Sequence, residues 1–158
     1  RSMTATVSLR PLSIFHRFIL YGLCGVTTEV FFTGLWNAIE NGEWRLVGVS
    51  SLYAFPVYGI AILLIESIGA VIRGTTHVII RGLLYMCIIY STEYTTGSIL
   101  KTWDLCPWDY STYFEYHFEG LVTAEYIPVW FFASILAEYL VIHSASNLAW
   151  ITVEEKID

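Results

Sequence analysis

The sequence predicts an all-α, polytopic membrane protein with four transmembrane helices, because it is unusually apolar and contains four long apolar segments. Of its 158 residues, 56% are hydrophobic and 14% are charged, whereas about a quarter of the residues in a soluble domain are charged. A chain of this length forms one domain and cannot bury so much apolar surface away from water. The lipid bilayer is therefore its expected solvent and partner.

Four segments are long enough to cross about 30 Å of hydrocarbon, which takes about 20 helical residues. They are residues 13–36, 48–71, 78–100 and 121–143. The helices are expected to run up and down in order, so both termini lie on the same side. A soluble four-helix bundle would need a polar face on each helix, and the stretches YGIAILLI and VWFFASIL have none.

Two tails flank this transmembrane domain of residues 13–143. Residues 1–12 form a basic N-terminal tail, and residues 144–158 form a short C-terminal tail expected to lie at the membrane surface. Lys and Arg favour the inner side, and they gather with the termini. The side of the termini has six basic residues: Arg1, Arg10, Arg17, Arg73, Arg81 and Lys156. The opposite side has two, Arg45 and Lys101.

The identity of the membrane stays open at this stage. Residues 1–17 contain three arginines and no acid, a composition that resembles the end of a mitochondrial presequence. A basic cytosolic tail fits these residues equally well. The protein is accordingly expected in the mitochondrial inner membrane or in another endomembrane or the plasma membrane.

Three glutamates stand out because they lie inside apolar segments. Counting about 1.5 Å per residue from the start of each span places Glu29, Glu93 and Glu125 in one layer near the outer side. No basic residue lies at this height, so a proton, a cation or a polar headgroup is expected to share the site. The alternative is that each glutamate snorkels or donates, when protonated, to a neighbouring carbonyl.

A second layer of charge lies near the inner side and has a different character. Arg17 and Arg81 fall at the same height as Glu66 and Glu138. Two acids beside two bases predict structural ion pairs.

The loop at residues 101–120 joins the third and fourth spans and is rich in aromatic residues. Trp108 and Tyr110 suit an aromatic belt at the headgroup level, whereas Asp109 either holds an Asx-turn after Pro107 or crowns the acidic layer. His117 near these acids gives only a weak metal signal, so metal binding stays undetermined. We find no catalytic triad order, phosphate loop or HExxH pattern, and expect no cofactor.

Several stretches carry a resemblance to the transmembrane protein 229 family over residues 16–142: RFILYGLCGVTTEVFFTGLW, GVSSLYAFPVYGIAILLIE, EYTTGSIL, CPWDYS and FEGLVTAEYIPVWF. YGIAILL, EYTTGSIL and WDYS also resemble, more distantly, bacterial membrane proteins labelled ABC-transporter components. The resemblance implies a polytopic helical membrane protein with no established reaction. The residues that this resemblance picks out are Glu29, Tyr58, Gly59, Glu93, Trp108, Asp109, Tyr110 and Glu125.

Two classes of function follow. In the first, the protein is a non-enzymatic accessory component of a larger membrane complex, with other membrane subunits as partners. Its acidic layer then binds a lipid headgroup, a cation or a basic partner residue. In the second, it is a small cation or proton carrier, or a membrane-embedded enzyme, that uses the same carboxylates. The net charge of −6 and the absence of a basic patch exclude nucleic acid as a partner.

Overall fold

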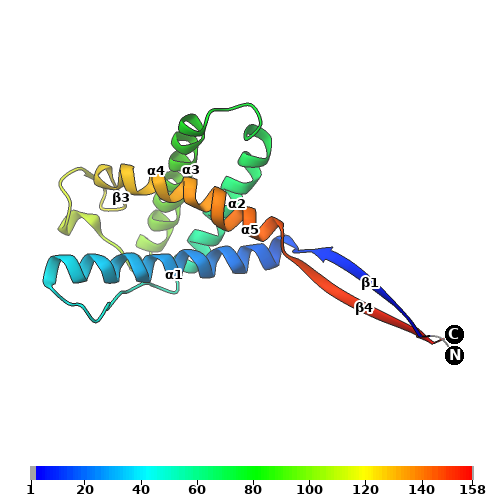
Figure 1. Ribbon diagram of the computed structural model, residues 1–158. Coiled ribbons are helices and arrows are strands. Elements are labelled where there is room, and N and C mark those ends of the chain that lie inside the picture. The colour runs from blue at the N-terminus through cyan, green and yellow to red at the C-terminus, as the bar shows by residue number, and fades with distance from the viewer. Residues whose placement is uncertain (1–2, 158) are drawn as a thin grey trace.

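Helices form the body of the protein in the computed structural model, which describes residues 3–157. The long helices are α1 (Ile14–Asn41), α2 (Ala54–Ile72) and α3 (Val78–Lys101). The fourth helix is built from consecutive pieces: η2 (Ala124–Tyr126), α4 (Ile127–Leu136), the π-helical turn η3 (Ala137–Ile142) and α5 (His143–Ser146). Figure 1 shows these helices gathered in one body, from which the two tails of the described chain lead away side by side.

Three of the helical segments are long and apolar enough to cross a membrane: Ile14–Asn41, Ala54–Ile72 and Ala124–Ser146. The predicted helical and membrane-spanning character is therefore confirmed. Helix α3 has the length, but Arg81, Glu93 and Lys101 interrupt its apolar sequence. Its crossing, and with it the four-span topology, stays a prediction.

Close contacts between small and aromatic residues hold consecutive helices together in antiparallel order. A Cβ atom at Gly22 would meet the ring of Phe55 at 2.7 Å, and one at Gly82 would meet the ring of Phe131 at 2.5 Å. Small residues commonly allow this approach between membrane helices. The α2–α3 pair is inclined to α1 and α4 (Figure 1), and a buried cluster fills the crossing: Tyr21, Ile62, Ile65, Tyr85, Ile142 and Ala145.

The observed ends of the first two helices differ from the predicted spans. Helix α1 continues to Asn41 and ends at Gly42, whose φ of 68° is left-handed. Helix α2 begins only at Ala54, because the preceding segment lies against α1. There the hydroxyl of Thr33 donates to the carbonyl of Val49 (3.0 Å) and accepts from its N–H (2.8 Å).

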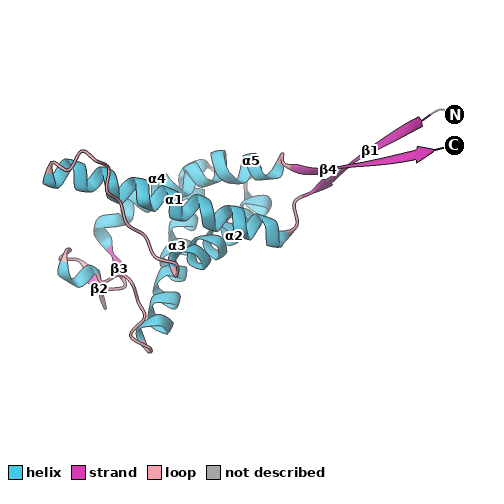
Figure 2. Ribbon diagram, turned by 90° about the horizontal axis from the view of Figure 1, so that it is seen from below, coloured by secondary structure: helices cyan, strands magenta, loops and turns pink. Residues whose placement is uncertain are grey.

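The two tails pair with each other, which the all-α prediction did not anticipate. Strand β1 (Met3–Pro11) and strand β4 (Ala149–Ile157) form an antiparallel two-stranded ribbon. Figures 1 and 2 show this ribbon leading away from the helices. The signal is the alternation of apolar and polar residues in Val7-Ser8-Leu9-Arg10 and Ile151-Thr152-Val153-Glu154, a period of two that is typical of strands.

A second, minute hairpin shapes the loop between α3 and α4. Strand β2 (His117–Phe118) pairs with strand β3 (Val122–Thr123), and a single 3-10 turn, η1 (Tyr110–Thr112), precedes them. The predicted fourth span therefore starts later than residue 121, since Val122 and Thr123 belong to this hairpin.

Candidate functional site

Glu93 is the most deeply buried acid among the predicted binding residues. It lies on α3 with only 7% of its surface exposed. The hydroxyl of Tyr110, from the loop, donates a 2.6 Å hydrogen bond to its Oε1 atom. A buried carboxylate is costly unless it is paired and hydrogen-bonded, so this bond fixes both the acid and the loop above it.

The second oxygen of Glu93 is left without a full hydrogen bond. Oε2 is buried and has no partner, and the same holds for Nε1 of Trp130 on α4. The indole N–H lies close to this carboxylate, yet outside hydrogen-bonding geometry. Buried polar atoms are nearly always satisfied, so the indole N–H of Trp130 is the candidate donor to this oxygen within the described chain. No sequence signal pointed to Trp130, because it is a tryptophan within an apolar helix.

Glu29 of α1 completes the acidic pair. The hydroxyl of Ser50 donates to its Oε2 atom at 2.6 Å, and Tyr58 of α2 lies close to both Glu29 and Glu93. Within residues 3–157, no ion pair involves Glu29 or Glu93. Glu29 and Glu93 each accept a hydrogen bond from a hydroxyl group, and their union in one site stays a prediction.

Aromatic rings close this region from above. Tyr126 packs against Tyr110 (centroid distance 5.4 Å), Phe114 (5.1 Å), Trp130 (6.0 Å) and Phe32 of α1 (6.3 Å). The cluster joins the loop to α1 and α4, and it lies beside the buried Glu93, whereas Glu29 is only half-buried.

The loop is held in place by bonds around Tyr110. The N–H of Tyr110 donates to the carbonyl of Gly120 (2.8 Å), and the indole of Trp108 donates to the carbonyl of Leu121 (3.1 Å). Asp109 caps η1, accepting from the N–H (3.0 Å) and the hydroxyl (2.6 Å) of Ser111. These bonds hold the pKa of Asp109 below its ordinary range.

Asp109 and Trp108 therefore have structural partners, in the loop and on α3, and a binding role for them stays a prediction. Asp109 is exposed and forms the Asx-turn that the sequence left as one of two alternatives. Trp108 packs over Gly97, where an added Cβ would lie 3.0 Å from its ring. In the same loop, His117 accepts from the N–H of Gly120 (3.2 Å). Across the described residues, no group of three or more His, Cys, Asp and Glu side chains could hold a metal ion.

Glu125 requires a correction, because its oxygens are used within the loop. Oε1 accepts from the N–H groups of Glu115 (3.1 Å) and Tyr116 (3.0 Å), and Oε2 accepts from the hydroxyl of Thr123. The depth estimate assumed a helix from residue 121, whereas Glu125 lies on η2, in the first turn of the segment Ala124–Ser146. Of the predicted three-acid layer, Glu29 and Glu93 remain as a predicted pair.

The inner layer contains ion pairs among the four residues named from the sequence. Arg17 contacts Glu66 (2.6 Å), and Arg81 contacts Glu138 (3.1 Å). Sequence reasoning missed Arg73, which reaches Glu138 at 2.7 Å, and the Tyr85 hydroxyl, which donates to it at 3.2 Å. Glu138 is only 1% exposed and lies on η3. Single π-turns often occur at functional positions in helices.

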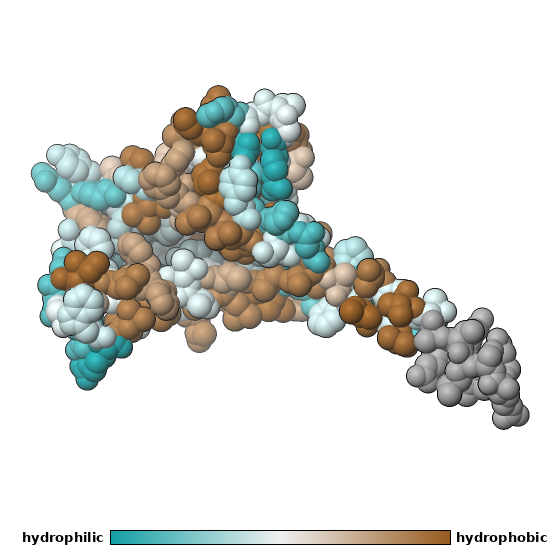
Figure 3. Space-filling view, viewed as in Figure 1, coloured by the Kyte–Doolittle hydropathy of each residue, from teal (hydrophilic) through white to brown (hydrophobic). Residues whose placement is uncertain are grey.

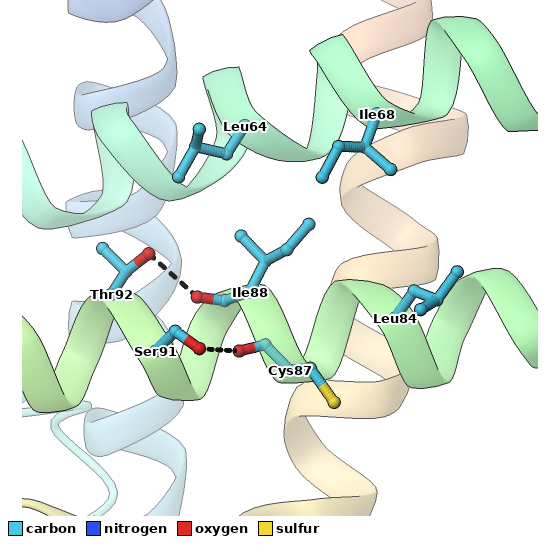
Figure 4. A pocket seen from close by; sticks show the side chains of 7 residues that line it. All are labelled: Leu64, Ile68, Leu84, Cys87, Ile88, Ser91 and Thr92. Atoms are coloured by element: carbon cyan, nitrogen blue, oxygen red, sulfur yellow. Dashed lines mark hydrogen bonds between the residues drawn. The ribbon is translucent and has the colours of Figure 1, made fainter.

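A groove between α2 and α3 offers a contrast to the acidic site. Its volume is about 320 Å³, and its walls are Leu64, Ile68, Leu84, Cys87, Ile88, Ser91 and Thr92. Figure 4 shows that the hydroxyls of Ser91 and Thr92 bond to carbonyls of their own helix, at 2.7 and 2.8 Å. The groove therefore presents an apolar surface, as expected for helices that face lipid.

Comparison with known proteins places this arrangement in context. Residues 16–157 match the family model described as "Putative ABC-transporter type IV". The match runs through α1, the acidic pair, the aromatic loop and strand β4. No solved structure matches the chain.

Proposed function

Because the chain belongs to the family described as "Putative ABC-transporter type IV", we propose that it is a non-enzymatic helical component of a larger membrane complex. The protein is an integral membrane protein related to ABC transporters. Its 158 residues hold no phosphate-binding loop. ATP hydrolysis in such a complex would therefore come from outside these residues.

The acidic pair is the proposed point of engagement, and it takes a cationic group. The observation that carries this is the Oε2 atom of Glu93, which is buried without a partner in a site that also holds Glu29. Carboxylates in a low-dielectric environment are stabilised by an opposite charge nearby, and no Lys or Arg of the described chain forms an ion pair with either acid.

Three groups share the required chemistry: the amine of a lipid headgroup, a basic side chain of a partner subunit, and a small cation. A partner residue or headgroup suits the component role, because the site lies beneath the outer-side loop and the rings of Tyr110, Phe114 and Tyr126 can contact its apolar part. Lipid binding and accessory-subunit assembly are parts of the proposal.

Native purification with mass measurement tests the component role. The wild-type protein is expected in a stoichiometric complex with another membrane protein or with retained lipid. Glu93→Gln keeps the side-chain shape and removes the charge, so it should release that partner. Glu125→Gln is the control, because Glu125 bonds within its own loop. A lone protein whose mass does not change in Glu93→Gln would contradict the proposal.

A second candidate is a small cation or proton carrier, and one observation favours it. The exposed Ser50 donates to Glu29 and Tyr110 donates to Glu93, and the hydroxyl of Tyr58 is influenced by both acids. Such a series can pass a proton. Cation or proton flux into liposomes that contain the purified protein, abolished by Glu93→Gln, would replace the component role with this one.

The resemblance to the transmembrane protein 229 family and the choice among cellular membranes remain predictions. Neither enters the argument for the acidic pair.

A further inference from the structure

The chain between α1 and α2 turns back and runs along α1 (Figure 1). Residues 46–51 of this segment, the strap, form neither a helix nor a strand. Backbone polar groups outside helices and sheets need other partners, and side chains of α1 supply them. The N–H of Val49 donates to the hydroxyl of Thr33 (2.8 Å), and Nδ2 of Asn37 donates to the carbonyl of Val47 (3.3 Å). The strap is therefore bonded to α1 at two successive points.

The backbones of the strap and of α1 are also in direct contact, at two glycines. A Cβ atom at Gly48 would overlap the carbonyl oxygen of Val30, and one at Gly34 would lie 3.1 Å from the carbonyl oxygen of Leu46. Strap residues 47, 48 and 49 thus meet helix positions 37, 34 and 33 in order. Positions three and four apart share one face of a helix, so the strap has a fixed register on one face of α1.

This register brings the hydroxyl of Ser50 to Glu29. Ser50 follows Val49 along the strap, and Glu29 lies one turn before Thr33 on α1. The hydroxyl of Ser50 donates a 2.6 Å hydrogen bond to Oε2 of Glu29. The contact between the strap and the acid is therefore the next step of the same register.

The bond between Ser50 and Glu29 depends on the strap, because water can reach it. Ser50 is exposed and Glu29 is half-buried, and hydrophilic residues gather at the end of the helical body where the strap lies (Figure 3). Water competes with such a bond, so the bond alone holds a chain segment only weakly. Leu46 enters the strap with a φ of 56°, in the left-handed region that residues with a Cβ atom rarely adopt. Contacts beyond Leu46 must therefore hold the strap in place.

We propose that Thr33 is a positioning residue for Glu29: it holds the strap in register and so keeps the hydroxyl of Ser50 on one oxygen of the acid. The hydroxyl of Thr33 accepts from the N–H of Val49 whether its own proton goes to the carbonyl of Val49 (3.0 Å) or to that of Glu29 (2.9 Å). The inference rests on the proposed function, in which Glu29 is half of the acidic pair. A cationic group would then meet Glu29 at Oε1, because Ser50 covers Oε2.

Chemical labelling of Glu29 tests this role. The purified full chain in detergent is treated with a water-soluble carbodiimide and an amine, and peptide mass spectrometry measures the labelled fraction of Glu29. Thr33→Val keeps the shape and removes the hydroxyl, so labelling should rise at least about threefold, the scale of one lost hydrogen bond. Thr33→Ser restores the hydroxyl and should return labelling to the wild-type level. Thr28→Val is the matched control on α1, because the hydroxyl of Thr28 donates to the carbonyl of Cys24 in its own helix (2.7 Å).

Two further readouts separate positioning from a general loss of structure. Ser50→Ala should raise the labelling of Glu29 as Thr33→Val does, and Glu138, which is 1% exposed, should stay unlabelled in every variant. Wild-type labelling of Glu29 in Thr33→Val, an equal rise in Thr28→Val, no return in Thr33→Ser, or a rise at Glu138 would each overturn the proposal. The labelling needs no partner, so a protein that retains no partner would contradict the proposed function and leave this pattern unchanged.

Discussion

The hydroxyl of Tyr110 donates a 2.6 Å hydrogen bond to the carboxylate of Glu93, and this contact joins the outer loop to the interior of α3. Seventeen residues separate the two in the chain. The bond makes the loop a fixed cover over the acidic pair, and it suggests how the cover can be loosened without altering the acids.

Tyr110→Phe removes the donor and keeps the ring. Hydrogen bonds to charged groups contribute about 1.5–3 kcal/mol, so we expect the free energy of unfolding in detergent to fall by about that amount. Tyr113→Phe is the matched control, because Tyr113 is 81% exposed. Equal effects of the two changes would show that the Tyr110 bond contributes nothing specific.

Gly25→Ala tests the close approach of α1 and α2. The added Cβ would enter the ring of Tyr58, and overpacking of this kind costs about 1–3 kcal/mol. Gly74→Ala, where nothing lies within 4 Å of the added atom, should change stability by less than about 0.5 kcal/mol. Thermal unfolding in detergent distinguishes the two, and a Gly25→Ala protein as stable as wild type would argue against tight packing here.

Arg81→Gln tests the buried network around Glu138. Removing the sole partner of a buried charge typically costs about 3–5 kcal/mol, and Arg81→Gln should cost less than this because Arg73 still contacts Glu138. Arg73→Gln should cost less, since Arg73 is partly exposed and Arg81 stays in place. The order of the two melting temperatures is the measurement, and a reversed order would contradict the assignment of Arg81 as the main partner.

Acid should loosen the outer loop through Asp109. Its folded pKa lies below the ordinary value of 3.8, because Ser111 bonds to the carboxylate. The stabilisation is therefore present above pH 3.8 and is lost as the pH falls through the folded pKa. Fluorescence of Trp108 should report a transition below pH 3.8 that Asp109→Ala abolishes. A transition that persists in Asp109→Ala would assign it to another group.

The helical body could be predicted from the sequence because long apolar runs have few alternatives in a membrane protein. The ribbon could not be predicted from either tail alone. The alternation in residues 7–10 and 151–154 is visible, but each strand gains its hydrogen bonds only from the other, about 140 positions away. The alternation indicates a strand in each tail, but it does not identify the partner of that strand.

Within the site, the shared height of Glu29 and Glu93 stays a prediction, whereas Glu125 bonds within the loop rather than facing them. The count along the spans assumed a helix from residue 121, whereas β3 and η2 occupy its first positions. Arg73 was missed for a related reason: it lies between two predicted spans, yet its long side chain reaches Glu138. The reach of a side chain and the structure of a loop depend on the tertiary fold, so counting residues along a span cannot predict them.

The most direct test of the central claim is a double-mutant cycle between Glu29→Gln and Glu93→Gln, measured as the free energy of unfolding in detergent. If the two acids form one site, the double change should differ from the sum of the single changes by at least about 0.5 kcal/mol. The parallel cycle of Glu125→Gln with Glu93→Gln should be additive. Strict additivity of Glu29→Gln and Glu93→Gln would contradict the account.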